Sequence, residues 1–120
     1  MPVTMNLESD NTLVFHFEGV LTQQQYRQFQ EHIESVGKQN GKIKLLVILG
    51  DFQGWEAADG WAETTDLTDL IDPYLIKMAL VGEERWRDKA EVFTLKGLRP
   101  VPIEYFVEDE SAARQWLNTA

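Results

Sequence analysis

The sequence predicts an α/β protein with a mixed, mostly parallel sheet of four to five strands and four helices, in the order ββαβαβαβα. Residues 43–49 and 75–81 form short apolar runs with little polar alternation, typical of strands covered on both faces. Segments with apolar residues at helical spacing lie between such runs. The first 18 residues instead alternate with period two, which indicates an antiparallel start. Strands that alternate with helices favour a parallel sheet with helices packed on it.

The chain opens with a predicted β-hairpin. Apolar residues alternate with polar ones before and after a turn cluster at residues 9–11, and this is the pattern of half-buried strands. The apolar members are Val3, Met5, Leu7, Leu13, Phe15 and Phe17.

The first helix is predicted to begin after Thr22. Gln25 follows three residues later, so the two side chains can form a capping box with the free backbone amides. One face of this helix is apolar, and its members are Tyr26, Phe29, Ile33 and Val36. Gly37 is a stop signal, and the Asn40-Gly41 pair marks the turn into the next strand.

The next two strands are predicted at residues 43–49 and 75–81. A loop at residues 50–54 and a second helix over about 59–71 connect them, and Pro73 ends that helix. The apolar members of this helix region are Ala58, Trp61, Ala62, Leu67, Leu70 and Ile71.

A third helix is predicted to open at Gly82 and Glu83, and Gly97 and Pro100 end its segment. Its shared apolar face consists of Trp86, Ala90 and Phe93. The last strand is predicted at residues 101–107. Asp109 then caps a final helix, whose apolar members are Ala112, Ala113, Trp116 and Leu117.

Composition restricts the classes of function. A chain of 120 residues predicts one domain, residues 1–120, without disulfides, because it has no cysteine. An isoelectric point near 4.6 argues against nucleic acid as a partner. The longest unbroken aliphatic run, residues 45–49, is too short to cross a membrane. The start of the chain does not look like a signal peptide, so the expected compartment is the cytoplasm.

The negative charge is concentrated in one segment. Residues 50–76 contain seven acids and no Lys or Arg, and so account for −7 of the net charge of −9. Residues 85–99 carry five bases and two acids, a local charge of +3. Both segments fit solvated helix faces. Alternatively, the acidic face meets the basic face within a dimer or across an interface with a protein partner.

No residue pattern indicates an enzyme, a cofactor or a metal site. The acids at 59–72 are spaced by three and four, which places them on one diverging helix stripe, whereas Ca²⁺ needs oxygens that converge. His16 and His32 have no partner at a zinc or triad spacing. No serine lies in a G-x-S-x-G turn, and no glycines form a nucleotide loop. We therefore expect no catalytic residue, no metal and no cofactor.

The candidate site is the strand-to-helix connection after residue 49, because ligands and partners bind at the carboxyl ends of strands in such sheets. Aromatic rings there either cover an edge of the core or line an apolar pocket or an interface. The candidate ligand- or partner-binding residues are Asp51, Phe52, Trp55, Asp59, Trp61, Glu63, Tyr74 and Trp86.

Five segments in this order resemble the SpoIIAA-like family, a branch of the STAS fold that is also similar to Sec14-type lipid-binding domains. The segments are 17–22 (FEGVLT), 41–46 (GKIKLL), 51–55 (DFQGW), 78–82 (MALVG) with Trp86, and 110–117 (ESAARQWL). The resemblance implies a four- or five-stranded sheet with four helices, in a cytoplasmic bacterial protein.

STAS domains of the anti-sigma antagonist type bind a kinase-like protein and are switched by phosphorylation of a serine at the start of the second helix. This chain departs from that pattern, because residues 50–60 contain no Ser or Thr. Acids stand there instead, at Asp51, Glu56 and Asp59.

The first functional hypothesis is a non-enzymatic regulatory or protein-interaction domain, expected as a homodimer or with a protein partner. Its contact surface would be Phe52, Trp55 and the acidic second helix, and Trp55→Ala would then weaken association with little loss of fold. The second hypothesis is a carrier or sensor of a small apolar or acyl ligand, as the resemblance to Sec14-type domains suggests. We expect no integral membrane association. The third hypothesis is an enzyme, and it ranks below the other two because the sequence offers no nucleophile, metal ligands or cofactor loop.

Overall fold

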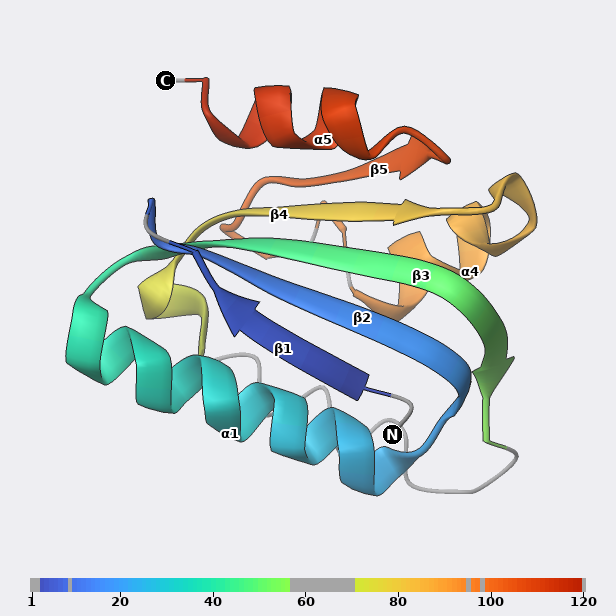
Figure 1. The fold of residues 1–120 in the computed structure, drawn as a ribbon, viewed down its shortest axis with the longest axis horizontal. Helices are drawn as coiled ribbons and strands as arrows, with labels where there is room; N and C mark the ends of the chain where they lie inside the picture. The colour runs from blue at the N-terminus through green and yellow to red at the C-terminus, as the bar shows by residue number, and fades with distance from the viewer. Residues whose placement is uncertain (1–2, 9, 57–70, 95, 98, 120) are drawn as a thin grey trace.

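The structure is a computed structural model that describes residues 3–8, 10–56, 71–94, 96–97 and 99–119. Figure 1 shows its elements in chain order. They are β1 (Val3–Leu7), β2 (Thr12–Leu21), α1 (Gln23–Asn40), β3 (Ile43–Trp55), the 3-10 turn η2 (Asp72–Tyr74), β4 (Leu75–Gly82), the 3-10 turn η3 (Glu84–Trp86), α4 (Arg87–Phe93), β5 (Ile103–Val107) and α5 (Glu110–Leu117).

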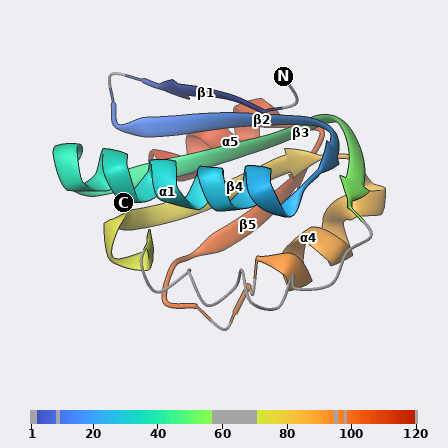
Figure 2. The same ribbon diagram turned by 90° about the horizontal axis from the view of Figure 1, so that it is seen from below.

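The described strands form one five-stranded sheet in the order β1-β2-β3-β4-β5. β1 is antiparallel to β2, and every other neighbouring pair is parallel. The helices α1 and α4 lie on one face of the sheet and α5 lies on the other (Figures 1 and 2). The predicted fold class is confirmed. The described part holds three α-helices, and the helix predicted over about 59–71 falls almost wholly outside the described residues.

Alternation along the strands divides the buried side chains into two cores. Leu13, Phe15 and Phe17 of β2 face the larger core, together with the apolar stripe of α1. Val14 of β2 faces the smaller core, which α5 closes with Ala113 and Leu117. β3 places Leu45 in the larger core and Leu46 in the smaller one, and β4 does the same with Leu80 and Ala79. These two strands are therefore covered on both sides, as their apolar runs predicted.

Helix α1 begins where the capping box predicted. The Gln25 N–H donates to Thr22 Oγ1 at 3.1 Å, and the Thr22 N–H donates to Gln25 Oε1 at 2.9 Å. The predicted stop at Gly37 is wrong, because the helix continues to Asn40 and Gly41 caps it. Gly37 is instead a contact point: a Cβ there would lie 2.6 Å from Cβ of Tyr74. Glycine is needed for the close approach of Tyr74 to α1.

The predicted loop at residues 50–54 is also wrong, because β3 continues as a strand to Trp55. Its register with β2 shifts twice: Phe17 pairs with Leu49, Gly19 with Phe52, and Val20 with Gly54. Each shift inserts one extra residue in β3, and such bulges bend a strand and change which side chains point inward. The bulges interrupt the period-two pattern, and this interruption resembled a loop in the sequence.

The carboxyl-terminal elements agree with the sequence in kind and differ at their ends. The third predicted helix is divided into η3 and α4, and only Ala90 of α4 is buried. The last strand begins at Ile103, two residues later than expected. Asp109 caps α5 as predicted, because its Oδ1 accepts from the Ala112 N–H at 2.9 Å.

Candidate interaction site at the carboxyl ends of the strands

The bulges of β3 bring Phe52 into the larger core. Leu49 points to that core, and strict alternation would place Phe52 on the opposite face. The extra residue reverses this, and the Phe52 side chain is 1% exposed. Phe52 therefore supports the site from inside and contributes no contact surface, contrary to the first functional hypothesis.

Three of the predicted aromatic residues form one cluster. The ring centroids of Phe52 and Trp55 are 5.0 Å apart, those of Phe52 and Trp86 5.2 Å, and those of Trp55 and Trp86 5.9 Å. All three pairs are near-perpendicular, the edge-to-face arrangement that aromatic quadrupoles favour. Gly54 has a φ of 107°, and a Cβ on it would lie 3.3 Å from the Trp86 ring. A glycine at position 54 adopts the positive φ without strain and leaves room for the Trp86 ring.

The two indole nitrogens of this cluster, Trp55 Nε1 and Trp86 Nε1, are buried and have no hydrogen-bond partner among the described residues. Buried indole N–H groups usually find an acceptor, and an unsatisfied buried donor costs roughly 1–3 kcal/mol. Both rings are half-buried at the end of the sheet.

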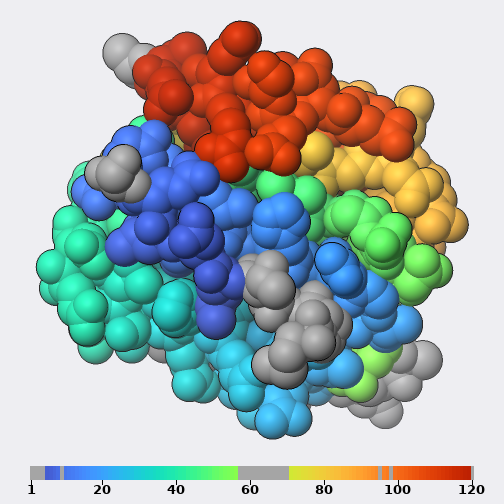
Figure 3. All heavy atoms as spheres, in the orientation of Figure 1, coloured from blue at the N-terminus to red at the C-terminus, as the bar shows by residue number. Residues whose placement is uncertain are grey.

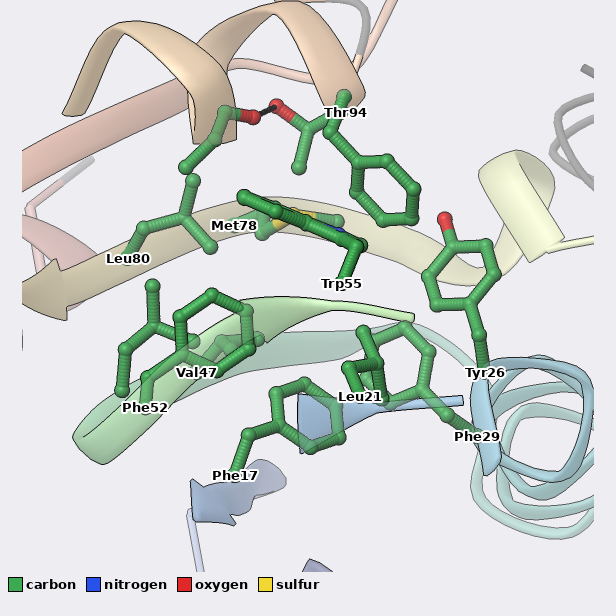
Figure 4. Close-up of a pocket in the computed structure, with 13 residues that line it drawn as sticks. Phe17, Leu21, Tyr26, Phe29, Val47, Phe52, Trp55, Met78, Leu80 and Thr94 are labelled. Carbon is green, nitrogen blue, oxygen red and sulfur yellow. Dashed lines mark hydrogen bonds between the residues drawn. The ribbon is translucent and has the colours of Figure 1, made fainter. Parts of the chain in front are cut away.

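An apolar cavity of about 40 Å³ lies between the sheet, α1 and α4. Figure 4 shows Phe17, Phe29, Phe52 and Trp55 converging on it from β2, α1 and β3. A cavity of about 150 Å³ holds a benzene-sized ligand, and drug-sized ligands occupy pockets of roughly 300–1,000 Å³. The cavity is therefore too small for an acyl chain in the arrangement described.

A second hollow, of about 260 Å³, opens at the carboxyl ends of β3 and β4, beside the start of α5. Its floor is apolar, with Ile48, Leu49 and Val81. Its rim is acidic, with Glu83, Glu108 and Glu110. Asp51, next to the lining residue Gly50, is exposed. We call Asp51, Glu83, Glu108 and Glu110 the acidic rim.

The backbone around the acidic rim is held in place by hydrogen bonds between elements. The Glu108 N–H donates to the Gly82 carbonyl at 2.9 Å, and the Tyr105 hydroxyl donates to the Glu83 carbonyl at 2.7 Å. Burial raises the pKa of Tyr105 to about 12, so the phenol stays a proton donor throughout the neutral range. The rim carboxylates are therefore presented from a fixed frame.

The basic residues of the segment 85–99 are engaged within the chain. Arg85 pairs with Glu83 at 3.2 Å, and Lys96 pairs with Glu91 at 3.1 Å. Arg87 lies 3.9 Å from Glu91, Lys89 lies over the Trp86 ring, and Arg99 binds Asp72. The hypothesis that this basic face meets an acidic face of a second copy loses support, because its charges already have partners.

The structure brings together only part of the predicted site. Phe52, Trp55 and Trp86 form the aromatic cluster, and Asp51, the residue before Phe52 in the chain, is exposed. Tyr74 precedes β4 and packs on Gly37, so it lies at the amino ends of the parallel strands, away from the cluster. Asp59, Trp61 and Glu63 lie outside the described residues.

Sequence reasoning missed Glu83, Glu108 and Glu110. A usable signal existed, because Glu83 and Glu108 directly follow the apolar runs of β4 and β5. Acids after the ends of neighbouring parallel strands meet at one edge of the sheet. Single acids after strands are a weaker signal in the sequence than the acidic segment 50–76.

The described residues contain neither a cluster of metal ligands nor a helix that could span a membrane. In residues 3–56 and 71–119, with the gaps named above, no three His, Asp or Glu side chains are grouped so that they could hold a metal ion. Over the same part of the chain, no helix combines the length and apolar character needed to cross a membrane. His16 is exposed on β2, and the His32 ring packs edge-on against Phe15.

Comparison with known proteins agrees with this architecture. A mixed five-stranded sheet with helices on both faces defines an α/β domain of the SpoIIAA type. The SpoIIAA-like family matches residues 12–118, and the chain belongs to this family, as the sequence resemblance predicted.

Two solved structures are similar along nearly the whole chain. An uncharacterised protein of the DUF3478 family with a SpoIIAA-like fold, from Shewanella loihica PV-4, is 21% identical with a TM-score of 0.70; the match covers 96% of this chain and 91% of that one. The unphosphorylated anti-sigma factor antagonist SpoIIAA is 11% identical with a TM-score of 0.62, over 98% and 99% of the two chains. At these identities the likeness shows the fold alone. Among curated proteins, no sequence matches the chain.

Proposed function

We propose that this chain is a non-enzymatic regulatory domain that binds a protein partner through its acidic rim. The observation that carries the proposal is the set of carboxylates around an apolar floor at the carboxyl ends of β3 and β4, where hydrogen bonds between elements hold the backbone of Glu83 and Glu108. The fold supports it, because the anti-sigma factor antagonist SpoIIAA, whose name describes an action on another protein, shares this architecture.

The charge balance specifies the chemistry of the partner. Glu83 pairs with Arg85 and Glu110 with Arg114, whereas the exposed acids Asp51 and Glu108 form no ion pair with the described residues. A surface with uncompensated negative charge attracts a positive one and speeds the encounter. A Lys or Arg side chain of the partner would lay its aliphatic stem on Ile48 and Val81 and its charge at the rim.

Regulation in this proposal does not use a phosphorylated residue between 50 and 60, because that segment has no Ser or Thr. The segment carries permanent carboxylates at Asp51, Glu56 and Asp59. We propose that binding is constitutive at this position, and that permanent negative charge takes the place of a phosphate.

Charge reversal tests the proposal. Three affinity-tagged chains are expressed in the native cells: the wild type, Glu108→Lys and the control Glu31→Lys. The control makes the same charge change at an exposed position of α1. The proposal predicts that one other protein co-purifies in stoichiometric amount with the wild type and with the control. The amount recovered with Glu108→Lys should be greatly reduced. Equal recovery with all three chains, or no specific protein with any, contradicts it.

A second candidate function is a sensor of a small apolar ligand with a hydrogen-bond acceptor. The indole N–H groups of Trp55 and Trp86, to which no described residue offers an acceptor, favour it, and Trp55 lines the apolar cavity. The volume of about 40 Å³ restricts such a ligand to a few non-hydrogen atoms unless the rings move. Native mass spectrometry of the protein purified from cells would show the added mass, and repeated absence of any adduct removes this candidate.

A further inference from the structure

Strand β1 forms an open edge of the sheet. It pairs with β2 on one side, and it is the first strand in the sheet order, so no described strand pairs with its other side. Figure 3 shows the dark-blue atoms of β1 on the face toward the viewer, with no described element in front of them. An uncovered edge offers unpaired backbone groups to another strand.

The hydrogen bonds of the hairpin show which backbone groups of β1 point away from β2. The Glu8 N–H donates to the Thr12 carbonyl at 2.9 Å, so the backbone of residue 8 points toward β2. Successive residues of an antiparallel strand point their N–H and C=O groups to opposite sides. Residues 3, 5 and 7 therefore direct these groups outward, in a set that is symmetrical about Met5.

The side chains near this edge suit an apolar contact. Met5 is 47% exposed and Leu7 is 39% exposed. They stand opposite Phe15 and Leu13, and so on the face of the sheet that α1 covers farther inward. Their apolar surface continues the larger core beyond the helix. Such a combination of exposed apolar side chains and open backbone marks a contact site.

β1 is short, with five residues, and Pro2 precedes it, but it lacks the other usual features that prevent pairing of edge strands. Strands at an edge are commonly protected by a lysine, a charged side chain that points inward, or a bulge. Residues 3–7 contain no charged residue, and their register with β2 is unbroken. The nearest acid, Glu8, accepts from Arg114 at 2.8 Å and is neutralised.

We propose that β1 pairs with β1 of a second copy of this chain, antiparallel and centred on Met5. This register places Met5 opposite its own equivalent and Leu7 opposite residue 3, so all three outward-pointing residues of each strand exchange backbone hydrogen bonds. The two-fold axis stands perpendicular to the sheet, and the two sheets join into one of ten strands. Such a two-fold interface is self-complementary, because both copies contribute the same edge to it.

A second copy fits this edge better than a strand of another protein for two reasons. The outward set is symmetrical about its own centre, so the same strand satisfies it completely. The acids closest to the hairpin are compensated within the chain, Glu8 by Arg114 and Asp10 by Lys44, so two chains of charge −9 meet here with little repulsion. Two five-residue strands bury less than the 1,200 Å² or so of a stable specific interface, so the dimer forms reversibly with rising concentration.

Sedimentation velocity over a wide concentration range tests the proposal. The wild type should change from monomer to dimer as concentration rises. Met5→Lys should lower the association constant at least tenfold, and so should Met5→Pro, which removes an outward N–H that the pairing with β2 does not use. Val92→Lys, at a position 74% exposed on α4, is the matched control and should associate as the wild type does.

Amide hydrogen exchange locates the contact. The amides of Met5 and Leu7 should exchange more slowly as concentration rises, while that of Asn6, which points toward β2, should not depend on concentration. The exchange rates of these amides are measured in the wild type, so they test the proposal even if Met5→Pro fails to fold. A wild type that sediments as a monomer at every concentration, or a dimer that Met5→Lys leaves unchanged, overturns the proposal. The acidic rim is not part of this contact, so its own test is independent.

Discussion

The Arg99 guanidinium lies buried against the Asp72 carboxylate, with Nε 3.1 Å from Oδ1 and 3.3 Å from Oδ2. The two side chains are only 3% and 9% exposed. Arg99 Nη1 also donates to the Thr94 carbonyl at 3.1 Å. This pair joins the turn before β4 to the segment after α4, and its charges cancel within the chain.

Removal of one member of this pair should be strongly destabilising. Arg99→Met leaves the Asp72 carboxylate buried without its counter-charge, and such a change costs roughly 3–5 kcal/mol of the free energy of unfolding. Urea denaturation measures it. The double variant Asp72→Leu/Arg99→Met should be more stable than Arg99→Met alone, because no charge is left buried. Additive losses would show that the two residues are not coupled.

Gly37→Ala should destabilise the protein although Ala favours helices. The added Cβ would lie 2.6 Å from Cβ of Tyr74, and such overpacking costs about 1–3 kcal/mol. Gly50→Ala is the control, because a Cβ there meets no atom of the described residues within 4 Å. Thermal denaturation compares the two. Tyr74→Gly, which removes the Cβ as well as the ring, should remove most of the penalty of Gly37→Ala. An equal effect of both alanine replacements, at positions 37 and 50, would refute the close approach.

Stability should fall at alkaline pH through Tyr26. Burial raises the pKa of Tyr26 from its usual 10.0 to about 12, because the phenolate is disfavoured in the core. The folded-state pKa lies above the unfolded one, so the stabilisation is complete below pH 10 and is lost as the pH rises toward 12. The full loss is roughly 3 kcal/mol. Denaturation at increasing pH should show a smaller decline in Tyr26→Phe, and an identical decline would contradict the prediction.

Trp55→Ala should weaken the fold itself. Trp55 is half-buried and packs on Phe52, Trp86 and Phe93, with the Phe93 ring centroid 5.2 Å away. Its truncation should cost roughly 2–3 kcal/mol, less than the 3–5 typical of a fully buried ring. Gln53→Ala, on the same strand, is exposed and should change stability little. This prediction replaces the sequence-based expectation that Trp55→Ala spares the fold; an unchanged urea midpoint would restore that expectation.

Local signals with a defined chemistry predicted the fold well. The Thr22 and Gln25 capping box and the Asp109 cap lie where expected, because each depends on residues three apart. The apolar runs of β3 and β4 also predicted doubly covered strands correctly. These features need no knowledge of distant contacts.

Features that depend on long-range packing were not predictable. The bulges that turn Phe52 inward are register shifts in the pairing of β3 with β2, and the role of Gly37 depends on Tyr74, far along the chain. The partner of Asp72 is Arg99, 27 residues away, and charge counting placed these residues in opposing surface patches. The grouping of Glu83 with Glu108 likewise needs the pairing of β4 with β5.

Site-specific photo-crosslinking in the native cells tests the central claim, the use of the acidic rim for a protein partner, most directly. A photoreactive residue is placed at position 51 or 108 on the rim, and at position 27 or 42 as exposed controls on α1 and before β3. The account predicts one adduct containing the same second protein from both rim positions and none from the controls. Equal adducts at all four positions, or adducts from the controls alone, would contradict it.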